Sequence, residues 1–595
     1  MSLSRSPGSL YGTTTHRVLA IPEIVELVFS FLDDAERANN ARVSKGWSEV
    51  ALDLLWRSVD DLPRLFGLLA QLDRHEDGTR FHRPLEPNDW TRFMHYASRV
   101  RTLSVEPGVD RVLRGPFVFD EVARSRTALN ILPKLTSFTW LSQQGDRLRM
   151  SLMFMHDSIK EFAVTLVPSP GYSLGTFFQE IKLRMPRLTH LDLKFTFSVC
   201  EIENDLCRLL EGLPKLQKLT MPRFTLTNKV IETLSLLPDL GTIQFEYIDQ
   251  GCGDSADLAK WNPALQEGAF PALYDFTISA EISQMLRFVQ GPFFPGSSLK
   301  SFYFHILTTT APALLHDFLA AVADACPALA ELYLDFVGTP HPIVYRRDPP
   351  HGDLVTWATL RPVLKCPKLT TFHFRWDTPL LISHADVAEL AAAWPALEVL
   401  VLNNEAPPTA RPSSNSSSSS SSSSTLTLDA LLPFARHCPR LRELGLCLAA
   451  ETASRAVPAL PPFRALRTLG LGLSRIPPAQ TDSEAAALFL SQLCPPGCAV
   501  TAGVEWPEFF GAAEAATEED AAALAGVLRE TAAWCERWAE VGRVLPLLTR
   551  LRMEERARRE ELEREVVDLR TRCRVLEERL GMGAGAMADK GCVLL

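Results

Sequence analysis

The chain has 595 residues, of which 46% are hydrophobic and 22% are charged, and its formal net charge is -10. This length exceeds what one hydrophobic core supports, so we expect several domains or a repeat array. The composition excludes a wholly disordered or collagen-like chain. Because nucleic-acid binders need clustered Lys and Arg to release counterions, the negative charge argues against that class.

The cysteines and the apolar runs indicate the cellular compartment. The 12 cysteines are scattered without paired spacing, and no apolar signal segment opens the chain. We therefore expect free thiols and an intracellular location, cytoplasmic or nuclear. No run approaches the roughly 18 uninterrupted apolar residues of a membrane span, so we expect no transmembrane helix.

After a disordered start over residues 1–15, residues 16–60 are expected to form three short helices. Pro22 suits the first turn of the first helix, and Ser44 suits the cap of the third. Four apolar residues recur at i, i+3, i+4 and i+7 on the first helix: Ile24, Leu27, Val28 and Phe31. This is more apolar surface than three short helices bury, which indicates a docked partner.

These elements resemble an F-box. The match runs from Ile21-Pro22 to Phe31-Leu32 and continues at Val43-Ser44-Lys45-Gly46-Trp47 and at Leu54-Leu55-Trp56-Arg57. It departs from the family pattern at Ile21 and Ser44, where Leu and Cys are usual, and by one residue fewer between Pro22 and Phe29. The resemblance implies binding to the Skp-type adaptor of a cullin-RING ubiquitin ligase, and through it to the cullin. The residues implied at the adaptor contact are Ile21, Pro22, Ile24, Leu27, Val28, Phe31, Trp47, Leu54 and Trp56.

Two other interpretations of these helices remain. Their apolar stripes could be the core of an ordinary larger domain. They could also be a helix-turn-helix DNA reader, although Glu49 and Asp53 stand against a single Lys45 on the third helix. That balance is unfavourable for contact with phosphates.

Residues 61–130 are expected to be a helical linker and cap, and residues 131–505 contain an internal repeat. Its unit is Pro, any residue, Leu, two residues, an apolar residue, one residue and another apolar residue, as at Pro186 and Pro214. The leading leucines of the copies are Leu135, Leu188, Leu216, Leu240, Leu273, Leu299, Leu329, Leu369, Leu397, Leu441 and Leu466. A serine-rich stretch at 406–425 interrupts the array and is expected to be a disordered loop.

Each copy should read as helix, proline turn and short strand, since proline ends the preceding helix. One copy cannot bury its own apolar face, so we expect a stacked solenoid with parallel strands on one side and helices on the other. The pattern resembles a degenerate leucine-rich repeat, but Thr196, Phe224 and Glu405 stand where that family usually has Asn. An ordinary α/β domain with parallel strands is the alternative.

Strand alternation would place the residues between the apolar positions on the outer face of the sheet. They mix aromatic and charged side chains, as binding surfaces do, and we expect them to form a substrate-recognition face. Its candidate residues are Asp192, Lys194, Gln244, Glu246, Tyr303, His305, Tyr333, Asp335, His373 and Arg375. A solvated, inert sheet face is the alternative.

Residues 506–580 are expected to form C-terminal helices, interrupted at Pro546. Six residues fall into a heptad seam: Leu562, Val566, Leu569, Cys573, Leu576 and Leu580. The seam predicts either self-association through residues 562–580 or docking onto the solenoid. The flexible tail 581–595 ends in Cys592-Val593-Leu594-Leu595, a prenylation signal that predicts a lipid on Cys592 and reversible membrane association.

The sequence contains no zinc-protease pattern, phosphate loop, nucleophile elbow or kinase motif. We therefore predict no catalytic residues, no cofactor and no metal site. The predicted α/β fold is a three-helix F-box, a leucine-rich-repeat-like solenoid and a C-terminal helix or short coiled coil. The functional hypothesis is a non-enzymatic substrate receptor of an SCF-type ligase, whose solenoid binds an unknown protein for ubiquitination. A lipid-anchored interaction scaffold is the alternative.

Overall fold

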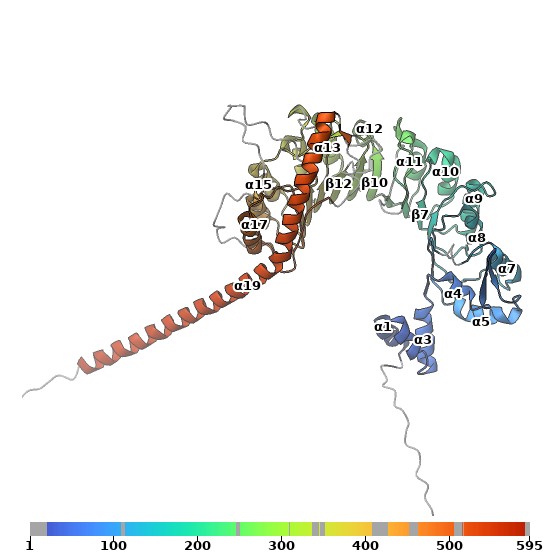
Figure 1. The fold of residues 1–595 in the computed structure, drawn as a ribbon, viewed down its shortest axis with the longest axis horizontal. Coiled ribbons are helices and arrows are strands. Elements are labelled where there is room, and N and C mark those ends of the chain that lie inside the picture. Colours follow the sequence, from blue (N-terminus) through green and yellow to red (C-terminus); the bar gives the residue numbers. More distant parts are fainter. Residues whose placement is uncertain are drawn as a thin grey trace, which may run out of the picture. The chain divides into compact units, whose positions relative to one another are not determined.

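The computed structural model describes residues 21–108, 113–245, 250–308, 310–335, 351–406, 426–450, 462–504 and 517–588, together with Leu19 and the pairs 344–345 and 514–515. The chain divides into two compact units. The first unit holds Met1–Ala280 and Gly291–Leu299, and the second holds Glu281–Gln290 and Lys300–Leu595. In Figure 1, helices α1 to α11 belong to the first unit and helices α12 to α19 to the second.

The first unit opens with three helices, α1 (Pro22–Ser30), α2 (Asp34–Asn40) and α3 (Lys45–Leu55). Asp33 and Glu36 form a reciprocal capping box at the start of α2. The Ser44 hydroxyl accepts a hydrogen bond from the Trp47 amide, at 3.2 Å, at the start of α3. These side chains satisfy backbone N–H groups that every helix leaves unpaired at its first turn, which fixes where α2 and α3 begin.

The core of these three helices uses a different face of α1 from the stripe that the sequence singles out. Val25 and Phe29 are buried with Ala51 of α3. The Phe29 ring meets the Trp47 ring edge-on, with centroids 5.4 Å apart. The stripe points to solvent instead, because each of its members is exposed: Ile24, Leu27, Val28 and Phe31.

The chain then enters the sheet region through β1 (Ser58–Val59), α4 (Leu62–Phe66), β2 (Leu72–His75), β3 (Gly78–Phe81), α5 (Pro87–Ala97), β4 (Thr102–Val105) and α7 (Phe117–Ser125). Strands β2 and β3 form an antiparallel hairpin, whereas β1 pairs in parallel with β4, with Ser58 opposite Thr102. The parallel sheet therefore starts before residue 131: β1 lies at the end of the range predicted as three helices, 16–60, and β4 lies in the range predicted as a helical linker and cap, 61–130.

The remaining strands of the first unit are β5 (Ser137–Trp140), β6 (Glu161–Thr165), β7 (His190–Lys194), β8 (Lys218–Thr220), β9 (Thr242–Gln244) and β10 (Asp275–Ala280). They lie in chain order, β1-β4-β5-β6-β7-β8-β9-β10. Between them come α8 (Leu148–Ser151), α9 (Leu174–Arg184), α10 (Glu203–Glu211) and α11 (Asn228–Ser235). Short 3₁₀ turns lie at Gly145–Arg147, Val199–Glu201 and Ser255–Leu258. Helices α9, α10 and α11 line one side of these strands (Figure 1).

The second unit repeats the alternation. Its strands lie in the order β11 (Ser301–Ile306), β12 (Glu331–Asp335), β14 (Thr371–Phe374), β15 (Val399–Leu402), β16 (Glu443–Leu446), β17 (Thr468–Gly470) and β18 (Ala499–Thr501). Its helices are α12 (Ile282–Val289), α13 (Pro312–Ala325), α14 (Trp357–Leu360), α15 (His384–Ala393), α16 (Leu431–His437), α17 (Gln480–Leu493) and α19 (Glu518–Ala588). The 3₁₀ turns are His351–Asp353, Arg361–Lys365 and Leu428–Ala430, and β13 (Val344–Tyr345) pairs separately with β19 (Glu514–Ala515).

The repeat sets the register of these strands. Every leading leucine of the eleven copies is buried, as Leu216 and Leu329 illustrate. The apolar positions of neighbouring strands also lie opposite one another, for example Leu332 opposite Phe372. The predicted class is confirmed: N-terminal helices are followed by parallel strands that alternate with helices, and a long helix comes last.

Four of the fifteen described strands of the sheet, β1, β4, β6 and β18, follow no copy of the sequence pattern, and two of these four keep its buried apolar spacing. One is β4, with Val100, Leu103 and Val105 buried, and the other is β6, where Ile159 and Phe162 begin the same buried triplet. Both place a β-branched residue where the pattern has leucine, and neither has the preceding proline. A pattern built only on apolar spacing would have found them.

Helix α19 continues through Pro546, so the predicted interruption there is wrong. Trp538, Val541 and Leu545 are buried beside the proline. The Trp538 indole donates to the Ser474 carbonyl oxygen at 2.9 Å. This packing on the second unit holds both sides of the proline in one helix despite the lost backbone hydrogen bond. Within the described residues, none of the helices is both long enough and apolar enough to cross a bilayer.

Candidate functional site

Among the described residues of the first unit, exposed large apolar side chains gather on one face of α1. Phe31 has 83% of its surface exposed and Leu27 has 58%. Ile21, Pro22, Ile24 and Val28 are exposed as well. These are six of the nine residues that the sequence assigned to adaptor contact, and they lie on or beside one helix. Contiguous exposed apolar surface of this kind is typical of interaction sites.

The other three assigned residues lie deeper. Trp47 and Leu54 are half-buried against the core of the three helices. Trp56 is buried: its ring lies 5.1 Å from that of Tyr96, and the Arg64 guanidinium stacks on it at 4.9 Å. Trp56 therefore joins α3 to the residues that follow and is not presented to solvent, contrary to the sequence-based assignment.

Sequence reasoning missed one exposed apolar residue of the module. Val43, between α2 and α3, has 62% of its surface exposed. Its signal was present in the sequence, because it is an apolar residue inside a polar stretch that would otherwise be an ordinary turn. Val43 is therefore a further candidate contact residue.

Polar contacts hold α3 against the strands that follow. The Arg99 guanidinium binds both the Glu49 and the Asp53 carboxylates, and it donates to the Glu49 carbonyl oxygen at 3.2 Å. The hydrogen bond from Arg99, and next its charge, hold the pKa of the Glu49 carboxyl below its ordinary value. Arg57 adds a contact to Glu26 of α1, with 2.6 Å between Nη2 and Oε1. Arg99 thus contacts two successive turns of α3, and Arg57 contacts α1.

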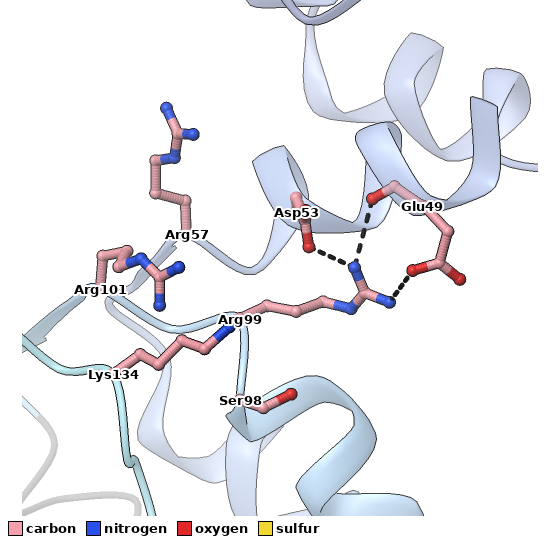
Figure 2. A pocket seen from close by; sticks show the side chains of 7 residues that line it. All are labelled: Glu49, Asp53, Arg57, Ser98, Arg99, Arg101 and Lys134. Atoms are coloured by element: carbon pink, nitrogen blue, oxygen red, sulfur yellow. Dashed lines mark hydrogen bonds and ion pairs between the residues drawn. The ribbon is translucent and has the colours of Figure 1, made fainter. Parts of the chain in front are cut away.

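These groups border a cavity of about 320 Å³. Figure 2 shows Arg99 reaching the two carboxylates of α3, while Arg57, Arg101 and Lys134 line the same space. The cavity is too polar to be a small-molecule pocket of the common apolar kind. It marks the junction between the three helices and the sheet of the first unit.

The candidate recognition residues fall into two sets because they belong to different units. In the first unit the Asp192 carboxylate accepts from Gln250 at 2.8 Å, and the Gln244 amide donates to Asp275 at 2.6 Å. Lys194 is half-buried at the end of β7, and Glu246 lies outside the described residues. The side chains of Asp192 and Gln244 are thus engaged with residues of their own unit.

The second unit brings three ring side chains together on adjacent strands. Tyr303, Tyr333 and His373 are opposite one another in the strand register. The ring centroids are 5.5 Å apart between the two tyrosines and 5.0 Å apart between Tyr333 and His373. Burial, and next the charge of Arg375, lower the pKa of His373 to about 4. The row is therefore a half-buried, uncharged aromatic surface near neutral pH.

Two members of the predicted face do not lie on its surface. His305 is fully buried and Asp335 is 5% exposed. The Tyr303 hydroxyl donates to the Asp335 carboxylate, and Arg375 lies 3.8 Å from the buried Glu405 carboxylate. Strand alternation puts His305 and Asp335 on the same face as Tyr303 and Tyr333, two residues further along each strand, but it does not reveal that these two positions are covered.

Two further features concern metal binding and lipidation. Among the described residues no group of three or more His, Cys, Asp or Glu side chains is arranged to hold a metal ion. Cys592, the predicted lipidation site, lies outside the described residues.

Comparison with known protein families gives a match in the region of the three N-terminal helices. Residues 22–61 match the model of the F-box-like family. No curated protein matches the chain. Solved structures with some likeness include the TLR13-ssRNA13 complex, at 13% identity and a TM-score of 0.31, with 63% of this chain and 47% of that chain covered. The chain thus spans about half the length of that first match.

Two further solved structures resemble the chain weakly. One is the Rad7 and Elc1 complex in yeast, at 14% identity and a TM-score of 0.29, with 59% of this chain and 71% of that chain covered. The other is the leucine-rich repeat-containing protein LegL7 from Legionella pneumophila, at 10% identity and a TM-score of 0.27, with 53% and 87% covered. The family match and the capped helices identify residues 22–61 as an F-box-like domain, and the buried leucine register shows that a leucine-rich-repeat-like region follows it.

Proposed function

We propose that this protein is a substrate-receptor subunit of an SCF-type cullin-RING ubiquitin ligase. In this function the F-box-like domain binds a Skp-type adaptor, the repeat region binds a target protein, and proximity to the ligase promotes ubiquitin transfer. The observation that carries the proposal is the exposed apolar face of α1 within a domain that matches the F-box-like family.

This face has the anatomy of a protein interface. Leu27 and Phe31 are exposed, whereas Val25 and Phe29 of the same helix are buried, so α1 is apolar on two sides for two different purposes. Glu23 is exposed at the start of the helix and supplies a polar edge. An apolar centre with a polar rim is typical of interfaces that exclude water from a few anchoring side chains.

The aromatic row of Tyr303, Tyr333 and His373 is the proposed centre of the target-binding face. The rings are held in register by adjacent strands and by each other. Aromatic side chains fixed in this way supply contact area at little cost in conformational entropy. The row therefore suits a target that presents an apolar or aromatic anchor.

The first experiment measures binding of the full-length protein to a purified Skp-type adaptor. The double variant Leu27→Asp, Phe31→Asp places two charges on the exposed face and leaves the Val25 and Phe29 core intact. We expect it to lose adaptor binding while its thermal unfolding is unchanged. The matched control is Leu183→Asp on α9, which charges a leucine with 76% of its surface exposed elsewhere in the first unit; it should bind like the wild type.

Two outcomes would count against the proposal. If the folded wild type does not bind the adaptor, the ligase function is wrong. If the double variant binds as tightly as the Leu183→Asp control, the α1 face is not the contact. A second experiment identifies the targets. We expect them to accumulate when the gene is deleted, and to return to normal abundance when the wild type is restored but not when the double variant is.

A further inference from the structure

The second part of α19 carries an apolar stripe that nothing in the described chain covers. Up to residue 550 the helix packs on the second unit and buries Trp538, Val541 and Leu545. From residue 553 to residue 578 every side chain is exposed. The stripe comprises Leu562, Val566, Leu569, Cys573 and Leu576, alternately four and three residues apart. This spacing keeps all of them on one face of a supercoiled helix.

We propose that residues 558–580 of two copies of this chain pair as a parallel, in-register, two-stranded coiled coil. In heptad terms Val566 and Cys573 occupy position a, which Arg559 holds in the first heptad, and the three leucines occupy position d. The β-branched Val566 at a, between leucines at d, favours a parallel dimer. The pairing segment is short, but it continues a helix that is already anchored by Trp538, so the cost of helix nucleation does not fall on the dimer.

The charges that flank the stripe select this partner. In a parallel dimer each position g faces position e of the following heptad on the second copy. The three facing pairs are Arg558 with Glu563, Glu565 with Arg570, and Arg572 with Glu577. Each pair joins opposite charges, and all six side chains are exposed in the single chain.

The same charges also fix the register. If one copy slides by one heptad, Arg558 faces Arg570, and Glu565 faces Glu577 of the second copy. Both contacts then join like charges, which disfavours the shifted pairing. In the single chain Arg572 pairs along its own helix with Asp568, at 2.9 Å. That exposed pair is weak and does not hold Arg572 back from a second copy.

The test uses the full-length protein and measures its mass in solution by sedimentation equilibrium. We expect the wild type to have about twice the 66.1 kDa of one chain. Leu569→Asp, at position d, should reduce the mass to that of one chain. The matched control is Val567→Asp, two residues away at position b, because Val567 has 62% of its surface exposed but lies off the stripe. It should remain a dimer.

Cys573 reports the orientation of the helices. A parallel, in-register pair places the two Cys573 thiols at the same level, so mild oxidation should give a covalent dimer that Cys573→Ser abolishes. An antiparallel pair would instead place Cys573 opposite a leucine. Three results would each overturn the proposal. The wild type could be a monomer, Val567→Asp could lose the dimer as fully as Leu569→Asp, or the dimer could form without a Cys573 crosslink. None of these readouts depends on adaptor binding.

Discussion

The indole Nε1 of Trp538 donates a hydrogen bond to the carbonyl oxygen of Ser474 across 2.9 Å, and the tryptophan is completely buried. Arg537 donates to the Ile476 carbonyl oxygen at the same distance of 2.9 Å. Two consecutive residues of α19 thus satisfy the backbone of the loop after β17, in addition to burying apolar surface. These contacts hold the middle of the first half of α19 on the repeat region.

Trp538→Ala should therefore destabilise the protein by about 3–5 kcal/mol, since it leaves a large cavity and an unpaired carbonyl group. Denaturant unfolding measures the change. The control is Leu551→Ala on the same helix, because that leucine has 60% of its surface exposed; its effect should stay within about 0.5 kcal/mol. Equal effects of the two substitutions would mean that α19 does not pack on the second unit as described.

Pro546→Ala should stabilise the protein. Pro546 lies inside α19 and its side chain is exposed, so the proline interrupts the backbone ladder without packing against a core. Alanine restores the hydrogen bond to the carbonyl group of Gly542 and removes a steric conflict, worth about 1–3 kcal/mol in a helix interior. A rise in the midpoint of thermal unfolding checks this. A fall would show that the proline ring makes a stabilising contact.

The two apolar faces of α1 should separate binding from stability. Phe29→Ala should lower the free energy of unfolding by about 3–5 kcal/mol, because Phe29 is buried against Trp47. Phe31→Ala should leave stability nearly unchanged and weaken adaptor binding, since it removes an exposed anchor. Calorimetric titration with the adaptor and denaturant unfolding, run on both variants, distinguish these effects. The idea fails if Phe31→Ala destabilises the fold as much as Phe29→Ala.

His373 should make stability depend on pH in a defined window. Its folded-state pKa is lowered from the ordinary 6.5 to about 4, first by burial and then by Arg375. The unfolded chain therefore binds a proton at a higher pH than the folded chain does. The free energy of unfolding is highest above pH 6.5, where His373 is neutral in both states, and it decreases as pH falls from 6.5 toward 4. His373→Phe keeps a ring beside Tyr333 and should flatten the stability curve between these values. An unchanged slope would assign the pH dependence to other groups.

Most of the repeat region could be predicted from the sequence because its pattern follows from the burial of apolar side chains. A leucine at a fixed distance before each strand must be buried, and Leu216 and Leu329 are. The copies at Val100 and Ile159 were missed because burial requires an apolar residue and not leucine in particular. The break at Pro546 was wrong for a different reason: local propensity yielded to tertiary packing around Trp538.

The candidate sites were predicted less completely. Exposure of Leu27 and Phe31 follows from a surplus of apolar residues in a small module, which the sequence reveals. The burial of Trp56 and His305 depends on segments distant in the sequence that cover them, and periodicity within one helix or strand carries no information about those segments. The contacts of Arg99 with Glu49 and Asp53 could not be predicted either, because they join residues about fifty positions apart in the sequence.

Helix α1 has nine residues, and the apolar ones are divided between an inner and an outer face. This division leaves the helix with little mutational tolerance. A saturation scan should find polar substitutions depleted at Val25 and Phe29 in any assay of protein abundance, but depleted at Leu27 only when growth depends on ligase activity. Glu23 should accept most replacements under both selections. The same nine residues would thus record two separate evolutionary pressures, one for folding and one for recognition.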